Sequence, residues 1–330
     1  MGAQALFTRQ KSSPAGQKTT QHRMSGRTKQ RTLAFYLFTS PWWIGFILLG
    51  IFPLVVGLLI SFSNYDGLNF ATVKLVGLKN YQRAFTDPDV TFSIARTLLW
   101  VVVNLPTWMI LSFLLALILN QDVKGRGLFR TLYYIPSVIP GVAAVAAWGI
   151  LLDKNYGLLN GLVSVFRPGT AIGWMSDYAM IGMAVIAIWG GLGGGMLIFL
   201  AGLQDIPDEL IEAARIDGAN RLQIFWHITL PLMTPIIFYQ LVMGLIGAFQ
   251  QLTLPLLVTK IATNLTQVPP RGVYLYMIHV WQQIYSKQRY MYGNALMWLL
   301  FIVVVIVTLL IFWSAKFWVY QAGEQEGEKS

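Results

Sequence analysis

Long apolar stretches alternate with short polar segments along most of this 330-residue chain. A helix needs about 20 mostly apolar residues to cross about 30 Å of hydrocarbon. The stretches that meet this requirement predict transmembrane helices at residues 33–62, 92–119, 131–152, 178–203, 232–253 and 295–320. Prolines interrupt some of them, which membrane helices tolerate when neighbouring groups satisfy the backbone. The predicted fold class is an all-α integral membrane protein with six transmembrane helices.

Composition supports a membrane location. Hydrophobic residues make up 55% of the chain and charged residues only 12%, whereas roughly a quarter of a soluble domain is charged. The chain has no cysteine, which excludes disulfides and thiolate metal sites. In a soluble protein the net charge of +10 would suggest nucleic acid. Here much of the excess lies near the N-terminus, and orientation in the membrane explains it better. We expect membrane lipid around the chain and no nucleic-acid partner.

The N-terminal segment, residues 1–32, is polar and basic and cannot bury a core. We predict a disordered tail there. A cleaved signal peptide is the alternative, but the tail is long and the next apolar run exceeds that of a signal peptide. The membrane domain is predicted at residues 33–320, and a short second tail at 321–330.

Charge also predicts the orientation of the spans. Six spans place both termini on one side of the membrane. The basic tail and the compact loop 120–130, with Lys124, Arg126 and Arg130, share that side, and such positive charge marks the cytoplasm. Both termini and segment 204–231 are therefore expected in the cytoplasm. The outer loops are then 63–91, 153–177 and 254–294.

Aromatic residues recur at near-helical spacing in the last outer loop, at Tyr274, Tyr276, Trp281 and Tyr285. Tyr and Trp concentrate where membrane meets water. We interpret this stretch as an interfacial helix with aromatic anchors, and a docking surface for another protein is the alternative.

The predicted spans carry no Asp, Glu, Lys or His well inside them. Proton-coupled and voltage-gated proteins need such groups to sense their driving force. Their absence argues against a proton pump, an antiporter or a voltage-gated channel. Sodium coupling through backbone carbonyls stays open.

The chain also lacks the patterns of nucleotide and metal chemistry. No GxxxxGK[ST] sequence occurs, so no P-loop holds a nucleotide. The glycine run in the fourth span has no such lysine, and small-xxx-small pairs such as Gly190 and Gly194 predict close helix packing. The three histidines are scattered, so we predict no metal site. No catalytic constellation appears either.

Segment 204–231 is charged, unlike the spans on either side, and its pattern predicts helix, turn, helix. Asp205 is the predicted N-cap of the first helix, with Pro207 in the first turn. Gly218 follows this helix, where glycine adopts a left-handed cap more easily than other residues.

The second helix of this segment is predicted to open with a capping box of Asn220 and Gln223 and to end at Pro231. An amphipathic linker on the bilayer surface is one interpretation of the pair. The segment is net acidic, however, and an anionic inner leaflet attracts basic helices. We therefore favour a protein partner. The acidic residues are Asp205, Asp208, Glu209, Glu212 and Asp217, and the basic ones are Arg215 and Arg221.

The same segment carries a long spaced motif, EAA-x3-G-x9-I-x-L-P. It is formed by Glu212, Ala213, Ala214, Gly218, Ile228, Leu230 and Pro231. It resembles the EAA motif of permease subunits of bacterial ABC importers. Asp217, Ala219, Phe225 and Pro235 extend the likeness to the sugar-importing branch. Flanking stretches such as LAGLQDIPDEL (200–210) and SPWWIGFILLGIFP (40–53) are similar to the first permease subunit of maltose-type importers.

This resemblance implies a type I importer fold in the bacterial cytoplasmic (inner) membrane. It implies a second permease subunit, an ABC ATPase dimer and an extracytoplasmic solute-binding protein as partners. ATP and Mg would bind to the ATPase subunits, with no cofactor on this chain, which would not itself be an enzyme. The coupling loop, residues 204–235, would insert into a cleft on an ATPase. Glu212 would make a polar contact there, while Ala213, Ala214 and Gly218 would permit the fit.

The resemblance further implies a sugar or oligosaccharide as substrate. In the family, polar and aromatic residues in the fifth span face the sugar, and Phe249, Gln250 and Gln251 occupy that stretch here. Gly194 stands in the fourth span where relatives often carry polar or bulky residues, and it is a further candidate. The alternative for the glutamines is a bond to a neighbouring helix. For the function, the alternatives are a polyamine or phosphate ester importer of the same architecture, or an ion-coupled secondary transporter.

Overall fold

The computed structural model describes residues 26–320, except 66, 68–72, 123, 261–263 and 265–266. Within these residues the regular secondary structure is helical, with one isolated antiparallel bridge between Ser63 and Leu75. The predicted all-α fold class is confirmed. The predicted tails lie outside the described residues, apart from residues 26–32, which begin the first helix.

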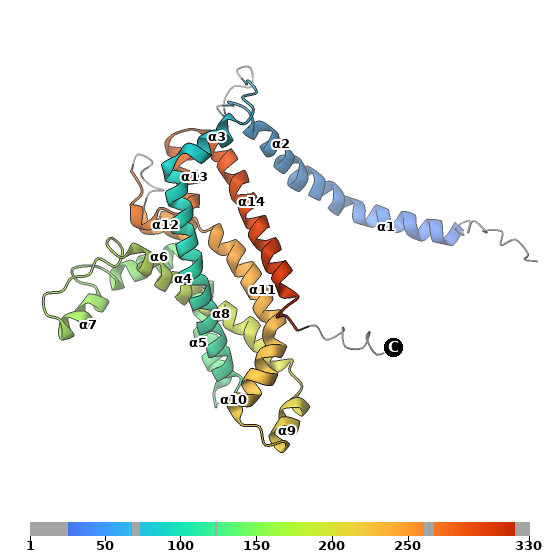
Figure 1. The fold of residues 1–330 in the computed structure, drawn as a ribbon, viewed down its shortest axis with the longest axis vertical. Coiled ribbons are helices and arrows are strands. Elements are labelled where there is room, and N and C mark those ends of the chain that lie inside the picture. Colours follow the sequence, from blue (N-terminus) through green and yellow to red (C-terminus); the bar gives the residue numbers. More distant parts are fainter. Residues whose placement is uncertain are drawn as a thin grey trace, which may run out of the picture. The chain divides into compact units, whose positions relative to one another are not determined.

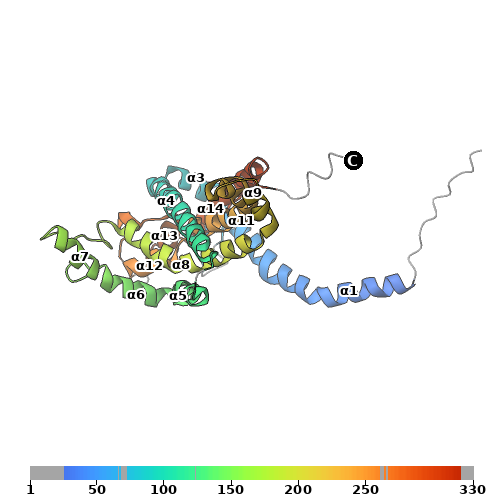
Figure 2. The ribbon, with the colours of Figure 1, turned by 90° about the horizontal axis from the view of Figure 1, so that it is seen from below.

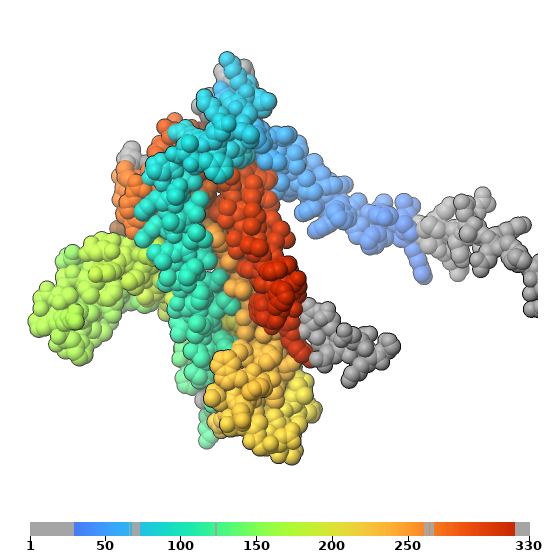
Figure 3. All heavy atoms as spheres, in the orientation of Figure 1, coloured from blue at the N-terminus to red at the C-terminus, as the bar shows by residue number. Residues whose placement is uncertain are grey.

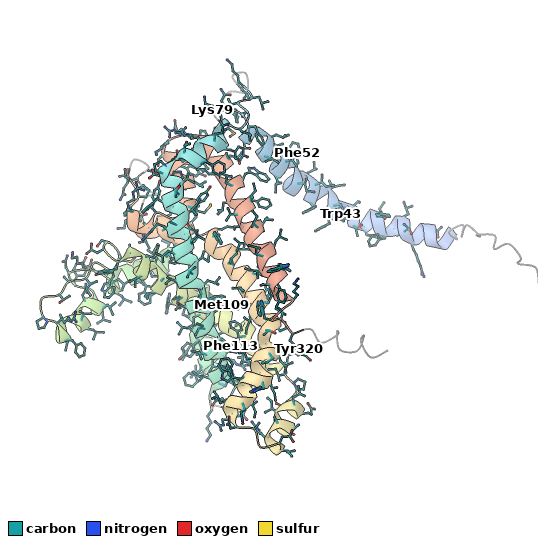
Figure 4. All side chains as sticks on the ribbon, in the orientation of Figure 1. Trp43, Phe52, Lys79, Met109, Phe113 and Tyr320 are labelled. Atoms are coloured by element: carbon teal, nitrogen blue, oxygen red, sulfur yellow. The ribbon has the colours of Figure 1, made fainter. Side chains whose placement is uncertain are left out.

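Two compact units make up the chain, Met1–Val56 and Gly57–Ser330. The described part of the first unit holds α1 (Gly26–Gly45), the π-helical η1 (Phe46–Ile51) and the start of α2 (Phe52–Ser61). These form one helix, on which Trp43 and Phe52 lie (Figure 4). The wide π turn precedes Pro53, and it leaves room for a ring that would otherwise clash with the preceding turn. The first span therefore continues through its prolines, as predicted.

The second unit is a bundle whose long apolar helices are α4 (Pro88–Leu119), α8 (Ala179–Gln204), α11 (Leu230–Phe249) and α14 (Tyr290–Ala315) (Figure 1). Each is long and apolar enough to cross a membrane. The start of α4 follows from its sequence. Asp87 accepts a hydrogen bond from the Asp89 N–H at 2.9 Å, and Pro88 occupies the first turn, where its missing N–H leaves no bond unmade.

The third predicted span, 131–152, is not one straight helix, and this prediction is corrected. The chain forms α5 (Arg126–Val138) and α6 (Gly141–Leu151), which meet at 100°. The break lies at Ile139 and Pro140. Proline disfavours helical backbone in the residue before it, and Ile139 is accordingly extended, with ψ of 129°. Next, α7 (Leu158–Phe166) continues away from α5 in two perpendicular views (Figures 1 and 2).

The bent pair still carries the chain from one end of the bundle to the other. α5 begins just after α4 ends, and α8 begins at Ala179. A β-carbon built on Gly272 would lie 3.6 Å from the Ala179 side chain. The Gly272 carbonyl in turn accepts a hydrogen bond from Arg96 in the first third of α4, at 2.5 Å. The six crossings predicted therefore correspond to five continuous helices and one bent pair among the described residues.

Glycines of α8 allow neighbouring helices to pack closely, as the glycine-rich stretch of the fourth span predicts. A β-carbon on Gly191 would lie 2.9 Å from Trp108 Nε1, and one on Gly195 would lie 2.7 Å from Trp108 Cζ2. Gly193 faces α5, where a β-carbon would overlap the backbone of Tyr133. The predicted pair Gly190 and Gly194 does not pack against the described residues of this chain, because a β-carbon on either would meet none of their atoms within 4 Å.

The aromatic segment after α12 (Thr253–Thr259) is buried rather than interfacial. It forms η5 (Arg271–Val273), α13 (Tyr276–Trp281) and η6 (Gln282–Ser286). Tyr274, Tyr276 and Trp281 are at most 8% exposed, so the prediction of aromatic anchors is wrong for them. Tyr285 alone of the four is exposed, at 56%. The segment is held by α4, because Thr97 Oγ1 accepts a hydrogen bond from the Tyr276 N–H at 2.8 Å.

Candidate functional site

The predicted helix pair projects from one end of the bundle, where the yellow surface of Figure 3 protrudes. Its first helix, α9 (Asp208–Ile216), begins after Pro207. Asp205 is not its N-cap, which corrects that prediction. The Asp205 N–H bonds to carbonyls of Ala201 and Gly202, so this residue closes α8 instead. Asp208 and Glu209 occupy the first turn of α9, where carboxylates stabilise the helix dipole.

A tight turn at Gly218 ends α9. Gly218 has φ of 84°, in the left-handed region. The Ala219 N–H donates to the Ala214 carbonyl at 2.9 Å, and the Gly218 N–H donates to that of Arg215 at 3.1 Å. This pair of bonds is the Schellman motif. It satisfies two of the four carbonyls that a helix end leaves open. The predicted glycine cap is confirmed.

The second helix opens with the predicted capping box. The Gln223 N–H donates to Asn220 Oδ1 at 2.9 Å, and the Asn220 N–H donates to Gln223 Oε1 at 2.8 Å. The helix runs through α10 (Arg221–Ile224) and the π-helical η3 (Phe225–Thr229) straight into α11. Pro231 therefore does not end it, and that prediction is wrong. The wide turn of η3 lies just before the proline, and it accommodates the ring as the turn before Pro53 does.

Between the two helices lies an open groove with a cavity volume of about 330 Å³. It is lined by Ala214, Asp217, Gly218, Ala219, Gln223, Ile224, His227 and Ile228. Only some of the predicted coupling residues line this groove. Ala214, Asp217, Gly218 and Ile228 line the groove. Glu212 and Ala213 are exposed on α9, whereas Leu230 and Pro231 lie half-buried where the helix enters the bundle.

Large apolar side chains of the same helix pair are also exposed. Ile216 is 87% exposed, Leu222 67% and Trp226 56%. Such side chains grouped on an otherwise charged segment mark a surface for association. The surface of the helix pair also carries negative charge, as the sequence predicts, because Glu209, Glu212 and Asp217 are exposed there.

The helix pair is connected to the bundle through aromatic rings. Phe225 lies 6.3 Å from Phe113, whose ring lies 5.2 Å from that of Phe199, measured between centroids. Phe113 is on α4, one turn beyond Met109 (Figure 4), and Phe199 is on α8. Sequence reasoning missed this contact, because only the bundle brings these three helices together.

The four residues predicted to face substrate are not gathered in one pocket of this chain. Phe249 is 4% exposed, and Gln250 is exposed at the end of α11. Gln251 is half-buried between α11 and α12. Gly194 faces open space, and its N–H lies 3.3 Å from Ser137 Oγ. Their role remains a prediction.

A different glutamine bridges two helices of the bundle. Gln240 on α11 is 3% exposed, and its Nε2 donates to the Gly195 carbonyl on α8 at 3.3 Å. Sequence reasoning missed it, although a lone amide within an apolar span is the signal for such a bond.

A buried polar cluster lies at the opposite end of the bundle. Tyr274 Oη lies 2.8 Å from His279 Nδ1, and His279 Nε2 lies 3.9 Å from Asp87 Oδ2. The His279 side chain is 0% exposed. Burial lowers the pKa of His279 to about 4, although the carboxylates of Asp87 and Asp89 oppose the shift. The imidazole is therefore neutral at pH 7. No group of three or more His, Asp or Glu suited to a metal occurs among the described residues.

Because folding lowers the pKa of His279, we expect the folded protein to lose stability in acid. A base whose pKa is lowered by folding stabilises the protein fully above its unfolded pKa of about 6.5, and the contribution is lost as the pH falls towards about 4. The free energy of unfolding is expected to fall by about 1.5 kcal/mol between pH 6.5 and pH 5. Thermal unfolding in detergent at several pH values measures this. His279→Gln should flatten the profile, whereas His227→Gln, at an exposed site, should leave it unchanged. An unchanged profile in the first variant would refute the assignment.

Comparison with known proteins adds to this geometry. Residues 108–319 match the family described as "Binding-protein-dependent transport system inner membrane component". A probable ABC transporter permease protein of Bacillus subtilis (strain 168), YesP, is 35% identical over 90% of this chain and 95% of its own length. The multiple sugar-binding transport system permease protein MsmF of Streptococcus mutans is 30% identical, over 78% of this chain and 87% of its own.

Solved structures show the same fold. A chain of a bacterial alginate ABC transporter, in complex with an alginate pentasaccharide-bound periplasmic protein, superimposes with a TM-score of 0.71. The match covers 88% of this chain and 96% of that chain at 20% sequence identity.

Proposed function

Because the chain belongs to the family of binding-protein-dependent transport system inner membrane components, we propose that it is a permease subunit of an ABC importer for a sugar or oligosaccharide. The substrate class is supported by relatives named for sugars, arabinooligosaccharides and trehalose or maltose. The permease translocates the solute and is not itself an enzyme. Its partners are a solute-binding protein outside the membrane and a second permease subunit that completes the pathway.

The observation that carries the proposal is the helix pair at the end of the bundle. Its groove, its exposed acidic residues and its uncovered apolar side chains suit insertion into a cleft on an ATPase. ATP and Mg²⁺ then belong to the ATPase dimer, which drives the change between inward-facing and outward-facing states. Phe225 and Phe113 pass movement of the docked pair to α4.

Orientation follows from this docking. The α9 end of the bundle faces the cytoplasm, and the end with α3 (Lys79–Thr86) faces outward. α14 ends near the cytoplasmic side, since the Tyr320 N–H donates to Thr234 Oγ1 at the start of α11, at 2.8 Å. Both termini are cytoplasmic on this proposal. Gln250, Gln251, Phe249 and Gly194 are proposed to lie along the sugar pathway. The open space beside Gly194 and the exposure of Gln250 support a surface completed by the second permease.

Reversing one charge on the helix pair tests the proposal. Glu212→Lys places a cation where the motif has an exposed carboxylate, so it should lose co-purifying ATPase and lower ATP-driven sugar uptake in proteoliposomes about tenfold or more. The control is Asp122→Lys, at an exposed carboxylate in the loop between α4 and α5 and outside the helix pair, which should retain most uptake. Normal uptake and normal ATPase recovery in Glu212→Lys would contradict the proposal that Glu212 contacts the ATPase. Uptake driven by an ion gradient with this chain alone would contradict the proposal that it is a subunit of an ABC importer.

A further inference from the structure

An apolar recess opens between three helices of the second unit, away from the groove at α9. Its cavity volume is about 220 Å³. Ala84 and Phe85 of α3, Ile94 and Leu98 of α4, and Leu299 and Val303 of α14 line it. Phe249, the last residue of α11, forms part of its wall.

Three polar side chains line the recess, the exposed Thr91 together with Thr97 and Tyr276, and the hydroxyl groups of Thr97 and Tyr276 are already hydrogen-bonded. Thr97 Oγ1 donates to the Ser93 carbonyl at 2.9 Å and accepts from the Tyr276 N–H at 2.8 Å. The Tyr276 hydroxyl donates to the Leu296 carbonyl at 2.8 Å. A sugar in this recess would leave its own hydroxyls unpaired against these groups, which is unfavourable. The recess therefore suits an apolar ligand.

The rim of the recess consists of exposed side chains of the short helix α3 and of the membrane-spanning helices α4 and α14. Phe85 is 78% exposed, Leu98 45% and Val303 37%. α4 and α14 are both candidate spans, and the recess lies within about 15 Å of the first residue of α4 at 1.5 Å per residue. Its mouth thus opens towards the acyl chains of one leaflet, which is the outer leaflet on the orientation proposed above.

The end of α2 packs on another face of α14. Asn294 Nδ2 donates to the Gly57 carbonyl at 2.6 Å. At 100° per residue, Leu299, Leu300 and Val303 lie roughly 140–240° around the helix from Asn294. The contact from Gly57 therefore leaves the mouth of the recess open.

Positive charge lies on the helix above the recess. Lys79 and Arg83 are exposed and one turn apart on α3, with Lys79 at the end of the unit opposite α9 (Figure 4). The nearby carboxylates already have partners. Asp89 pairs with Arg271 at 2.7 Å, and Asp87 accepts from the Tyr292 hydroxyl at 2.9 Å.

We propose that this recess binds one acyl chain of a phospholipid, whose phosphate lies against Lys79 and Arg83. A cation at the membrane surface attracts an anionic head group, and the apolar wall holds the chain. The bound chain contacts Phe249, and Gln250 follows directly. Lipid in the recess thereby restrains the end of α11 next to the exposed Gln250.

The test is lipid retention by the full chain, purified in detergent with whatever proteins accompany it. Native mass spectrometry should detect one phospholipid per copy of this chain. Leu98→Trp fills the recess and should lower retention about tenfold. The control Leu309→Trp, at a 62% exposed position elsewhere on α14, should keep the lipid. Thermal unfolding of each variant verifies folding. No retained lipid in the unaltered chain, or equal retention in Leu98→Trp, would overturn the proposal, as would cross-links showing another subunit in the recess.

The head-group contact is tested separately. A delipidated sample is supplied with phosphatidylglycerol or with diacylglycerol carrying the same acyl chains. Phosphatidylglycerol should be retained several-fold better, and Arg83→Gln should remove the difference. Equal retention of the two lipids by the unaltered chain would show that the phosphate is not recognised.

Discussion

Replacing Gly218 by valine is expected to abolish ATP-driven uptake while leaving the bundle folded. The backbone at Gly218 has φ of 84°, which disfavours L residues by about 1–2 kcal/mol and β-branched residues by more. The chain relieves this strain by opening the Schellman turn, and α9 then changes its angle to the second helix. A docking surface built from both helices is lost with that angle. Uptake in proteoliposomes should fall at least about tenfold, together with recovery of the ATPase.

A matched substitution separates backbone strain from steric overlap at this position. A β-carbon on Gly218 would meet no atom of the residues that the structure describes within 4 Å, so space is not the constraint. Gly218→Asn should therefore retain most uptake, because asparagine tolerates the left-handed region. Equal loss in the asparagine and valine variants would show that the side chain, rather than the turn, interferes with docking.

The second large effect is expected at Gly193, where leucine should prevent the bundle from assembling. Its β-carbon would overlap the Tyr133 carbonyl and lie 2.7 Å from Tyr134 Cα. Both are backbone atoms of α5, which cannot move aside as a flexible side chain can. Overpacking of this kind costs about 1–3 kcal/mol and sometimes more. The yield of monodisperse protein after size-exclusion chromatography should drop about tenfold.

Gly190→Leu is the control for Gly193, since it lies in the same helix one turn earlier and faces open space. It should fold normally. If both variants fold equally well, α5 does not lie against α8 as described. If both fail, the glycines matter for a reason other than this contact.

The spans were predictable because each is a long apolar run, and length alone decides whether a helix can cross the membrane. The bend at Pro140 was not predictable in the same way. Pro106 lies inside an unbroken α4, so a proline in an apolar run does not by itself indicate a break. The outcome depends on which neighbouring helix supports the chain, and that is a property of the bundle.

In the candidate site, too, features set by local sequence were predictable, whereas features set by packing in the bundle were not. The Gly218 turn and the Asn220 capping box are local hydrogen-bonding patterns, and the sequence predicted both. The start of α9 and the passage through Pro231 were mispredicted, because they depend on where α8 ends and on a π turn with no clear sequence signature. Phe249 is the sharpest case. Its position along the chain predicts a place in the pathway, and only the fold shows that it also forms part of the wall of the apolar recess.

The unbroken helix from Arg221 to Phe249 makes the docking segment a lever. Its 29 residues span about 43 Å at 1.5 Å per residue. Pivoting this rod by about 5° at one end would displace the other end by about 4 Å. The regular hydrogen bonding of this rod is interrupted by the wide turn at Phe225–Thr229 and by Pro235 within α11. The stiffness of the helix at these positions would determine how much of the displacement of its docked end is transmitted to Gln250.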